Sequence, residues 1–341
     1  MKLSKLPLII TTSLLLFSCG NRKKEISIFI YDSNDTFITT LSNQIFEKIS
    51  TDYSVKLYDS KKSQILQNQQ IVESFNHKNI NTLIINMVDR LSSGSIIQKA
   101  AQKNIPIIFF NREPVLSDIK GSNNVYYVGT NPVQEGENQA KMAIDLLGDP
   151  SNINENIDKN NDNKLQCVFI RGEQSHQDTE LRTYSCINYL IENGYQIDTL
   201  DMKYADWDKA KGKLVMEEFY NLYGDQIEFV FSNNDDMALG AIEYLIQENI
   251  FNANLSSLDQ PFPIVGVDGT KVGLNSIKNG YLYGTTINDA SNQAEAIRQL
   301  VQVINHERNL NQLDFNLTNN THIYVSGSIV TIDNVDDYLI K

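Results

Sequence analysis

The sequence predicts an α/β protein of two Rossmann-like lobes, each built around a parallel sheet. Short runs rich in Ile, Val and Phe, typical of strands buried on both faces, alternate with segments whose apolar residues recur every three or four positions. Such alternation indicates βαβ units with right-handed crossovers. The pattern begins near residue 25 and starts again near residue 166, and 341 residues are too many for one ordinary core. Two lobes in series are therefore expected.

The first series of elements begins with residues 25–31 (EISIFIY), whose β-branched and apolar side chains are typical of a buried parallel strand. Leu41, Ile45 and Ile49 then recur every four residues, which indicates a helix. The same reasoning gives the other elements of this half. They are strands at residues 55–58, 82–86, 107–110 and 126–128, and helices at residues 71–77 and 95–103.

The second series follows a passage between lobes near Thr130 and a polar stretch at residues 148–164. Its first helix ends at Asn193-Gly194, a common way for a helix to stop. The strands expected are residues 166–170, 196–200, 228–232, 263–267 and 282–287. The helices expected are residues 179–192, 210–223, 236–248, 272–279 and 290–306.

The N-terminus has the pattern of a secretory signal. Lys2 and Lys5 accompany an apolar stretch, residues 6–17, which is shorter than the about 20 residues that a membrane span needs. It ends in LFSCG, which resembles a bacterial lipobox, with an ordinary signal and a chance cysteine as the alternative. The expectation is a lipoprotein signal peptide at residues 1–19, lipidation at Cys19 and a tether at residues 20–24, giving an exported protein anchored at the outer face of the cell membrane or held in the periplasm.

The net charge excludes some classes of binding partner, and the number of cysteines limits the disulfides that can form. A net charge of −13 argues against nucleic acid, which requires a basic surface, and against binding to anionic lipid by charge. After the signal, only Cys167 and Cys186 remain, in an expected strand and the helix after it. A disulfide is conceivable in an exported protein, but two buried apolar thiols are the favoured interpretation.

Polar and aromatic residues gather just after the expected strands of both lobes. Ligands of open α/β sheets lie beyond the carboxyl ends of the strands, so these residues are candidate ligand contacts. Carboxylates and amides suit sugar hydroxyl groups, and aromatic faces suit the C–H patches of a sugar ring. Trp207, the single tryptophan, lies in a polar loop and is a candidate stacking surface, although a lone Trp is more often a packing residue. The strand ends supply Asp35, Phe37, Asn111, His176, Asp178, Arg182, Asn234, Asp268 and Asn288.

Seven motifs in order resemble those of the glucose/galactose-binding proteins of bacterial ABC importers, a family of type I periplasmic binding proteins. They are YDSNDTF, IFFNREP, YYVGT, RGEQSHQDTELRT, SNNDDMALGA, VGVD and TINDASNQA. The resemblance runs from about residue 25 to the C-terminus. It implies a three-segment hinge, with crossings near Thr130, Asn288 and Gln312. The lobes would then be residues 25–131 with 288–312, and residues 132–287 with 313–341.

The resemblance implies a role for each candidate contact. Asp35 would hold the 4-hydroxyl of either epimer, Asp178 the anomeric hydroxyl, and Arg182 the ring oxygen. Phe37 and Trp207 would sandwich the pyranose. The remaining hydroxyl contacts would come from Asn111, His176, Asn234, Asp268 and Asn288. Where this chain has Gln174-Ser175, the family usually has Pro-Gly, which makes His176 the contact most affected by the departure.

The polar stretch carries a candidate calcium loop. From Asp158, oxygen-bearing side chains recur at alternate positions, which suits a hard cation. A solvated loop rich in Asn and Asp, without a metal, would show the same pattern. Phe169 stands where an EF-hand has its glutamate, so the loop is not an EF-hand, and Asn163 stands where Gly is usual. The resemblance implies a structural Ca²⁺ that also takes a distant glutamate. The ligands would be Asp158, Asn160, Asp162, the Lys164 carbonyl, Gln166 and Glu228.

The function implied is a binding protein that carries glucose, galactose or methylgalactoside to an ABC permease and its ATPase. The protein is expected to be a monomer, and a chemoreceptor is a further expected partner. The alternative is a sensor that presents sugar to a membrane chemoreceptor or kinase. An enzyme is not expected, because no nucleophile elbow, Walker A or G-x-G-x-x-G motif occurs. A sugar-sensing transcriptional regulator would need a helix-turn-helix ahead of the first strand, where only the signal and tether stand.

Overall fold

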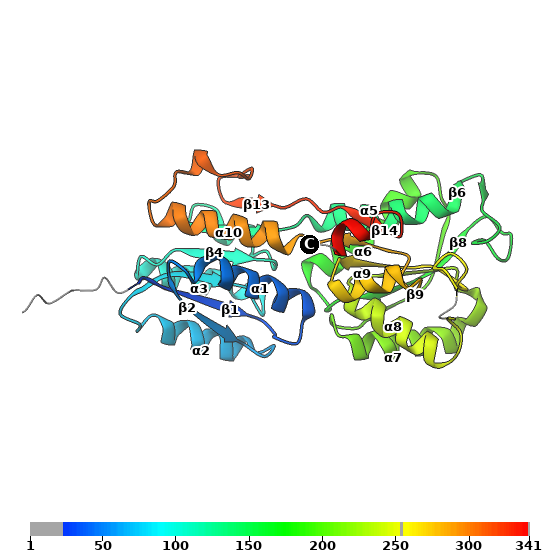
Figure 1. Ribbon diagram of the computed structural model, residues 1–341, viewed down its shortest axis with the longest axis horizontal. Coiled ribbons are helices and arrows are strands. Elements are labelled where there is room, and N and C mark those ends of the chain that lie inside the picture. Colours follow the sequence, from blue (N-terminus) through cyan, green and yellow to red (C-terminus); the bar gives the residue numbers. More distant parts are fainter. Residues whose placement is uncertain (1–22, 253–254, 340–341) are drawn as a thin grey trace, which may run out of the picture.

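The computed structural model describes residues 23–252 and 255–339 and shows two lobes along its long axis (Figure 1). The predicted signal peptide with Cys19, and the tether before residue 23, lie outside the described residues. Each lobe is a sheet covered by helices on both faces. The predicted fold class, two α/β lobes with parallel sheets, is confirmed.

The first lobe has a six-stranded sheet in the order β13-β5-β4-β3-β1-β2, with every neighbouring pair parallel. Its strands are β1 (Glu25–Ile30), β2 (Ser54–Asp59), β3 (Ile80–Ile85), β4 (Ile107–Phe110), β5 (Val125–Gly129) and β13 (His322–Tyr324). Its helices are α1 (Thr36–Ile49), α2 (Gln64–Ser74), α3 (Ser93–Gln102), α4 (Leu116–Ile119) and α10 (Ala290–Ile304), with short 3-10 turns at Arg90–Ser92 and Leu310–Gln312.

The second lobe repeats the arrangement in the order β14-β12-β11-β10-β8-β9, and only the β12–β14 pair is antiparallel. Its strands are β8 (Leu165–Arg171), β9 (Ile197–Tyr204), β10 (Phe229–Ser232), β11 (Ile264–Asp268), β12 (Gly284–Ile287) and β14 (Ile329–Thr331). Its helices are α5 (Pro132–Leu147), α6 (Gln177–Glu192), α7 (Lys209–Tyr223), α8 (Asp235–Gln247), α9 (Lys271–Lys278) and α11 (Asp336–Leu339), with a 3-10 turn at Gly224–Gln226. A small hairpin of β6 (Gly148–Asp149) and β7 (Asn152–Ile153) follows α5.

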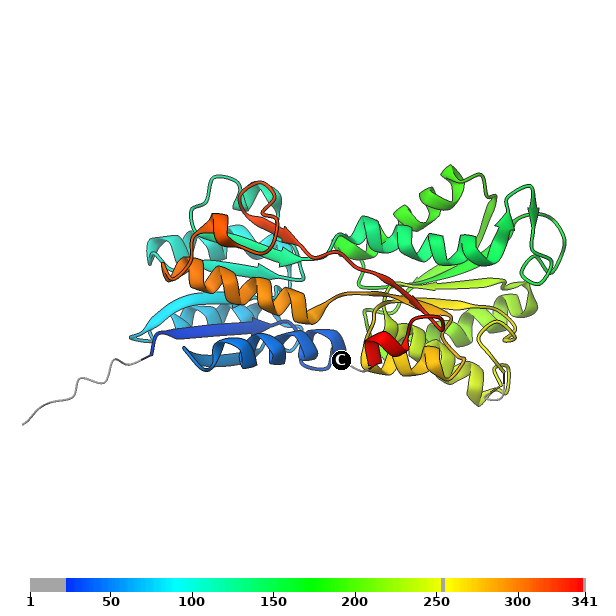
Figure 2. The ribbon, with the colours of Figure 1, turned by 45° about the horizontal axis from the view of Figure 1, so that its top comes forward.

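Three segments connect the lobes, and two of them lie where the sequence predicted (Figure 2). The first joins β5 to α5 at residues 130–131, and the second joins β12 to α10 at residues 288–289. The predicted third crossing near Gln312 is wrong. The chain stays in the first lobe through β13, which pairs with β5, and crosses at residues 325–328 before β14 joins β12. Strand pairing thus keeps residues 313–324 in the first lobe.

Each sheet has an apolar core on either face. In the first lobe, one core contains Ile45 of α1 and Leu300 of α10, and the other contains Ile71 of α2 and Ile96 of α3. In the second lobe, α7, α8 and α9 cover one face, while α5 and α6 cover the other. The two cysteines, Cys167 and Cys186, are buried free thiols in this last core. This agrees with their interpretation as apolar packing residues.

Most helices that follow a strand begin at a polar residue whose side chain accepts a backbone N–H from the first turn, the usual way a helix start is satisfied. These capping residues therefore lie at the strand ends that face the other lobe. They are Asp35, Ser63, Asn131, His176, Asp208, Asn234, Thr270 and Asp289.

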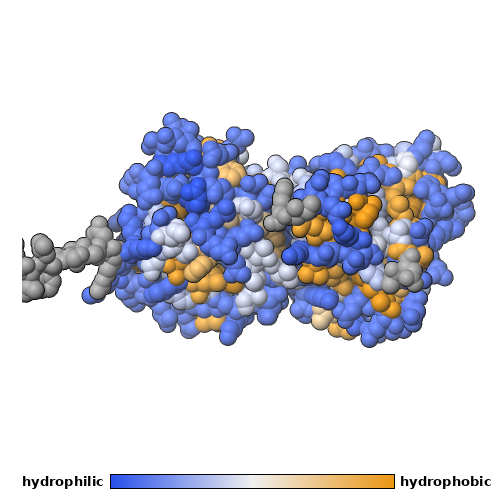
Figure 3. Space-filling model, in the orientation of Figure 1, coloured by the Kyte–Doolittle hydropathy of each residue, from blue (hydrophilic) through white to orange (hydrophobic). Residues whose placement is uncertain are grey.

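The surface is largely hydrophilic in the view of Figure 3, with apolar patches on both lobes. Within the described ranges, no helix combines the length and apolar character that crossing a bilayer requires.

Candidate functional site

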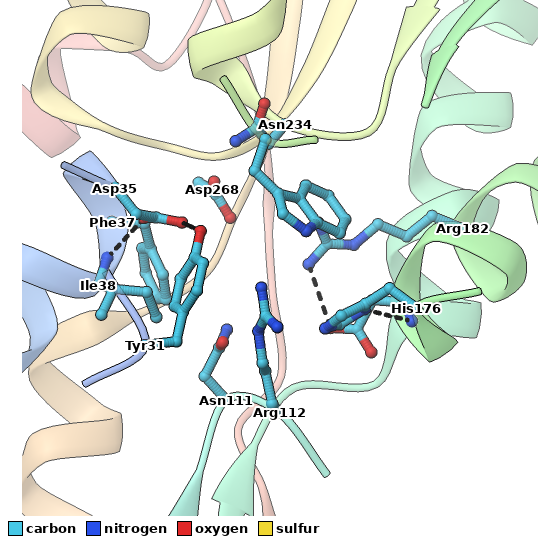
Figure 4. A pocket seen from close by; sticks show the side chains of 12 residues that line it. Tyr31, Asp35, Phe37, Ile38, Asn111, Arg112, His176, Arg182, Asn234 and Asp268 are labelled. Carbon is cyan, nitrogen blue, oxygen red and sulfur yellow. Dashed lines mark hydrogen bonds and ion pairs between the residues drawn. The ribbon is translucent and has the colours of Figure 1, made fainter. Parts of the chain in front are cut away.

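A pocket between the lobes gathers nine of the ten predicted sugar contacts (Figure 4). Asn288 is the one that does not line it. Residues from both lobes meet here, because the carboxyl ends of the two sheets face each other across the hinge. The pocket is lined by Tyr31, Asp35, Phe37, Ile38, Asn111, Arg112, His176, Asp178, Arg182, Trp207, Asn234 and Asp268.

Asp35 is fixed by the start of α1. One carboxylate oxygen accepts the backbone N–H of Ile38 at 2.9 Å, and the other accepts the hydroxyl of Tyr31 at 2.7 Å. Burial raises the pKa of Asp35, and these hydrogen bonds only partly oppose the shift. Phe37, two residues further on, is 6% exposed and packs into the core of the first lobe. A carboxylate and an aromatic ring therefore reach the pocket from one helix start.

Asn111 follows β4 in a left-handed conformation, with a φ of 60°, which Asn tolerates better than most residues. Asn86 donates to its side-chain oxygen at 3.1 Å, and Tyr127 donates to its backbone carbonyl at 2.8 Å. The oxygen of the Asn111 amide is thus occupied by a neighbour, which leaves its N–H₂ group to donate to a ligand.

His176 and Asp178 begin α6 in the second lobe. The Nδ1 atom of His176 accepts the backbone N–H of Asp178 at 3.2 Å, so His176 caps the helix in spite of the unusual Gln174-Ser175 before it. Burial, together with nearby Arg112 and Arg182, lowers the pKa of His176 well below its usual value, so the ring is neutral. Burial raises the pKa of Asp178 to about 6.

Arg182 is held by a buried ion pair. Its Nε lies 2.6 Å from a carboxylate oxygen of Glu135, on α5, and its Nη1 donates to the carbonyl of Asn233 at 2.7 Å. Its Nη2 lies 4.0 Å from Asp178, one helical turn away. The guanidinium is therefore fixed between the pocket carboxylate and a second, buried carboxylate.

Trp207 follows β9 with a φ of 62° and places its ring edge-to-face with His176, with centroids 5.3 Å apart. The guanidinium of Arg182 lies 5.6 Å from the ring centroid. Gly172 makes this position possible, because a Cβ atom there would lie 2.2 Å from the indole. The indole ring can therefore lie at the pocket only because residue 172 is a glycine without a side chain.

Asp268 and Asn234 come from neighbouring strand ends. Asp268 ends β11 with a φ of 116°, a strained conformation for any residue but Gly, and burial raises its pKa well above the usual value. Asn234 caps α8 by accepting the N–H of Met237 at 2.9 Å. Asn288, in the second crossing, donates to Asp268 at 3.4 Å and accepts from Gln293. Asn288 therefore lies behind Asp268 instead of lining the pocket.

Three pocket residues were missed from the sequence: Tyr31, Ile38 and Arg112. All three lie in or next to the motifs YDSNDTF and IFFNREP, immediately beside predicted contacts. The position of Arg112 directly after a strand end was the signal that could have found it. Glu135, which pairs with Arg182, gave no signal, because it lies in α5, a helix that the sequence did not predict.

The candidate calcium loop forms a compact turn next to β8. The carboxylate of Asp158 accepts the backbone N–H groups of Asp162 and Asn163, at 3.1 and 2.8 Å. Asn163, which stands where Gly is usual, takes the left-handed conformation that a Gly would adopt there, with a φ of 58°. Both oxygens of Glu228 accept backbone N–H groups of the loop region, from Lys159 at 2.7 Å and Gln166 at 2.9 Å. The distant glutamate thus does reach this loop.

The oxygen set of this loop suits a hard cation. Among the described residues, the side-chain oxygen of Gln166 is buried and has no hydrogen-bond partner. Asp158 and Glu228 are buried as well, and burial raises the pKa of Glu228. No group of three or more His, Cys, Asp or Glu side chains in the described ranges is arranged to hold a metal by itself. A cation here would have to combine the carboxylates with amide and backbone oxygens, as calcium does.

Comparison with known proteins identifies the family. A model of the periplasmic binding protein domain matches residues 26–308. The D-galactose/methyl-galactoside binding periplasmic protein of Haemophilus influenzae is 34% identical over 287 residues, which are 83% of this chain and 81% of that protein. The xylitol-binding protein of Mycolicibacterium smegmatis is 24% identical over 273 residues, which are 80% of this chain and 70% of that protein.

Solved structures show the same fold. An ABC transporter solute binding protein from Bacillus halodurans with bound myo-inositol has a TM-score of 0.75 at 24% identity, and the match covers 95% of this chain and 99% of that one. A galactofuranose binding protein has a TM-score of 0.76 at 15% identity, covering 93% and 98% of the two chains. The chain belongs to the periplasmic binding protein family, in its two-lobed type I class.

Proposed function

We propose that this chain binds D-glucose or D-galactose between its lobes and delivers the sugar to an ABC importer. One observation carries the proposal: carboxylates, amides and aromatic rings from both lobes converge on one pocket. The relative at 34% identity is named for galactose and methyl-galactoside, which favours these sugars over the other polyols that more distant relatives bind.

The chemistry of the pocket suits a neutral polyol. Asp35, Asp178 and Asp268 would accept hydrogen bonds from the hydroxyl groups of the sugar. Charge-assisted hydrogen bonds of this kind are among the strongest available to an uncharged ligand. Phe37 and Trp207 supply the flat apolar surfaces for the two faces of a pyranose. A sugar that lacks one of the matched hydroxyls would leave a buried carboxylate unpaired and would be rejected.

The position of the pocket also gives the transport mechanism. A ligand that contacts both lobes binds the closed arrangement more tightly than an open one, so it shifts the population towards closure. A closed, sugar-loaded protein would dock on the permease, and opening there would release the sugar. The three connecting segments supply the hinge.

Isothermal titration calorimetry of the mature protein against glucose, galactose, methyl-galactoside, ribose and myo-inositol tests the proposal. We expect glucose or galactose to bind most tightly, and Trp207→Ala or Asp178→Ala to abolish that binding with the fold intact. Tyr184→Ala is the matched control, because Tyr184 is a half-exposed aromatic residue of α6 outside the pocket. Tightest binding of ribose or myo-inositol, or unchanged glucose titration in the two pocket variants, would refute the assignment.

We also propose that Asp158, Asn160, Asp162, the Lys164 carbonyl, Gln166 and Glu228 bind a structural Ca²⁺. The unpaired oxygen of Gln166 and the buried carboxylates support this proposal. A chelator should lower the thermal midpoint of the protein, and Gln166→Leu should remove most of that sensitivity. Asp149→Asn, in the neighbouring hairpin, should not, because the carboxylate of Asp149 accepts its hydrogen bonds from Ser151 and lies outside the proposed ligand set. A midpoint that is indifferent to chelator in the native protein would rule the ion out.

Finally, we propose that Cys19 carries the lipid that anchors the protein at the outer face of the cell membrane. The LFSCG sequence after a short apolar stretch supports this. The native protein should partition into the detergent phase when Triton X-114 separates, and Cys19→Ser should partition into the aqueous phase. Equal partitioning of the two would leave Cys19 without this role.

A further inference from the structure

Two consecutive residues after β4 reach across the pocket to the other lobe. The Nη2 atom of Arg112 lies 3.0 Å from a carboxylate oxygen of Glu173. The next residue, Glu113, accepts the side-chain N–H of Gln177 at 2.8 Å. Glu173 and Gln177 stand on either side of His176, and Gln177 directly precedes Asp178. The two contacts therefore hold the very segment of the second lobe that brings His176 and Asp178 to the pocket.

Arg112 is fixed within its own lobe before it crosses. Its side chain is 4% exposed, its Nη1 donates to the carbonyl of Val88 at 2.7 Å, and its guanidinium lies 3.8 Å above the ring of Tyr31. A guanidinium held in this way keeps its orientation, so little conformational entropy is lost when Glu173 approaches.

Glu113 is fixed by the strand that precedes the third crossing. Tyr324 of β13 donates to its carboxylate at 2.9 Å, and the Nε2 atom of buried His322 lies 3.3 Å away. Burial alone would raise the pKa of Glu113, but the nearby His322 ring and the hydrogen bonds from Tyr324 and Gln177 outweigh it and leave the pKa below its ordinary value. Glu113 thus joins the end of β4, the beginning of the third connecting segment and the opposite lobe.

We propose that Arg112 and Glu113 are positioning residues that form an interlobe clasp with Glu173 and Gln177, and that this clasp sets the sugar affinity. The proposal rests on the function proposed above. It adds a device that acts through the lobes and not through the sugar: each clasp contact exists only when the lobes are together, so each one raises the fraction of closed molecules before sugar binds.

The energetic link to affinity is direct. The apparent dissociation constant equals the intrinsic constant divided by the fraction of molecules in the binding-competent arrangement. Opening must also precede release, so clasp contacts slow dissociation more than they change association. On the far side of the pocket, the contact between the backbone N–H of Thr36 and Asp236 is longer, at 3.4 Å, and contributes less.

The test uses variants of the two clasp residues in the second lobe, neither of which lines the sugar pocket. Glu173→Gln with Gln177→Leu removes the negative charge that faces Arg112 and the side-chain N–H that Glu113 accepts, and it leaves Arg112 and Glu113 in place. Glu180→Gln is the matched control, because Glu180 also pairs with a buried arginine, Arg171, but inside the second lobe. The glucose and galactose dissociation constants and dissociation rates are measured for each, together with the radius of gyration without sugar by small-angle X-ray scattering.

In the double variant we expect a larger radius of gyration without sugar, a return to the native value at saturating sugar, and a dissociation constant weakened by about 5- to 30-fold. Most of the change should appear as faster dissociation. Glu180→Gln should change neither quantity beyond about twofold. A sugar-free radius equal to that of the native protein, or an unchanged dissociation constant, would overturn the clasp.

The two proposals fail in different ways. If the native protein binds none of the sugars, the proposed function is lost, while the scattering of the sugar-free variant still reports on the clasp. If the native protein binds sugar and the variant scatters and binds as the native protein does, only the clasp is lost.

Discussion

Acidification should weaken sugar binding, and Asp178 gives the size of the effect. Burial raises its pKa from 3.8 to about 6 in the structure. An ionised carboxylate accepts strong hydrogen bonds on both oxygens, whereas protonation turns one oxygen into a donor and weakens the other as an acceptor, so the sugar favours the ionised form. With a pKa of about 6, roughly nine in ten Asp178 side chains are ionised at pH 7, but only about one in eleven at pH 5. The dissociation constant should therefore rise about tenfold between these values.

The other pocket carboxylates act in the same direction. Burial also raises the pKa values of Asp35 and Asp268, so protonation of these carboxylates on acidification weakens binding in the same sense as protonation of Asp178. Binding at pH 6 should release protons, because the sugar selects the ionised forms. Calorimetric titration in two buffers of different ionisation enthalpy measures both the affinity and the number of protons released.

The Asp178→Asn variant separates the pH effect of Asp178 from the pH effects of Asp35 and Asp268. It should bind sugar weakly at every pH and should lose part of the pH dependence between 5 and 7. The raised pKa of Asp178 also makes the free energy of unfolding depend on pH. Because the pKa of Asp178 is higher in the folded protein than in the unfolded chain, its contribution to the free energy of unfolding falls as the pH rises from about 4 to about 6. Affinity that stays flat from pH 7 to 5, or proton uptake on binding, would refute the reasoning.

Three further predictions concern the frame of the pocket. Gly172→Ala places a Cβ atom 2.2 Å from the indole of Trp207, so it should lower the free energy of unfolding by about 1–3 kcal/mol in urea titration and also weaken sugar binding. Glu135→Ala leaves the buried guanidinium of Arg182 without its partner and should cost about 3 kcal/mol in the same assay; a loss below about 1 kcal/mol would contradict the pair. Asp268→Gly relieves a φ of 116° and should raise the free energy of unfolding by about 1 kcal/mol while calorimetry shows no sugar binding; a less stable variant would disprove the strain.

The sequence predicted those elements whose burial follows from apolar residues alone. Residues 107–110 form a strand with the predicted ends, because all four side chains are apolar and buried. The α5 helix was missed, since its buried face includes Glu135 and Gln139, and Gln139 donates to the carbonyl of Ser232. A buried face that is satisfied by polar partners elsewhere in the chain leaves no local apolar pattern.

The same contrast, between local sequence patterns and contacts with distant parts of the chain, explains which parts of the hinge and of the site were predicted. The third crossing was misplaced because β13 has three residues and is held by pairing with β5, nearly two hundred positions earlier in the chain. Eight of the nine predicted pocket residues were found because strand ends and motifs mark them, and Trp207 was found as the single tryptophan in a polar loop. Tyr31 and Arg112 were not assigned, because their place depends on each other: the guanidinium lies over the tyrosine ring, and neither residue alone indicates that contact.

The capping residues have a consequence for how such a pocket can change. Asp35, His176 and Asn234 each accept a backbone N–H with a side-chain atom while facing the cleft, so replacing any of them removes a helix start along with a contact. Lost caps cost about 1 kcal/mol each. Trp207 starts no helix, and at a φ of 62° it already bears the backbone cost that most replacements would have. Divergence towards another solute would therefore meet less resistance at this loop position, and the capping residues would be the last to be exchanged.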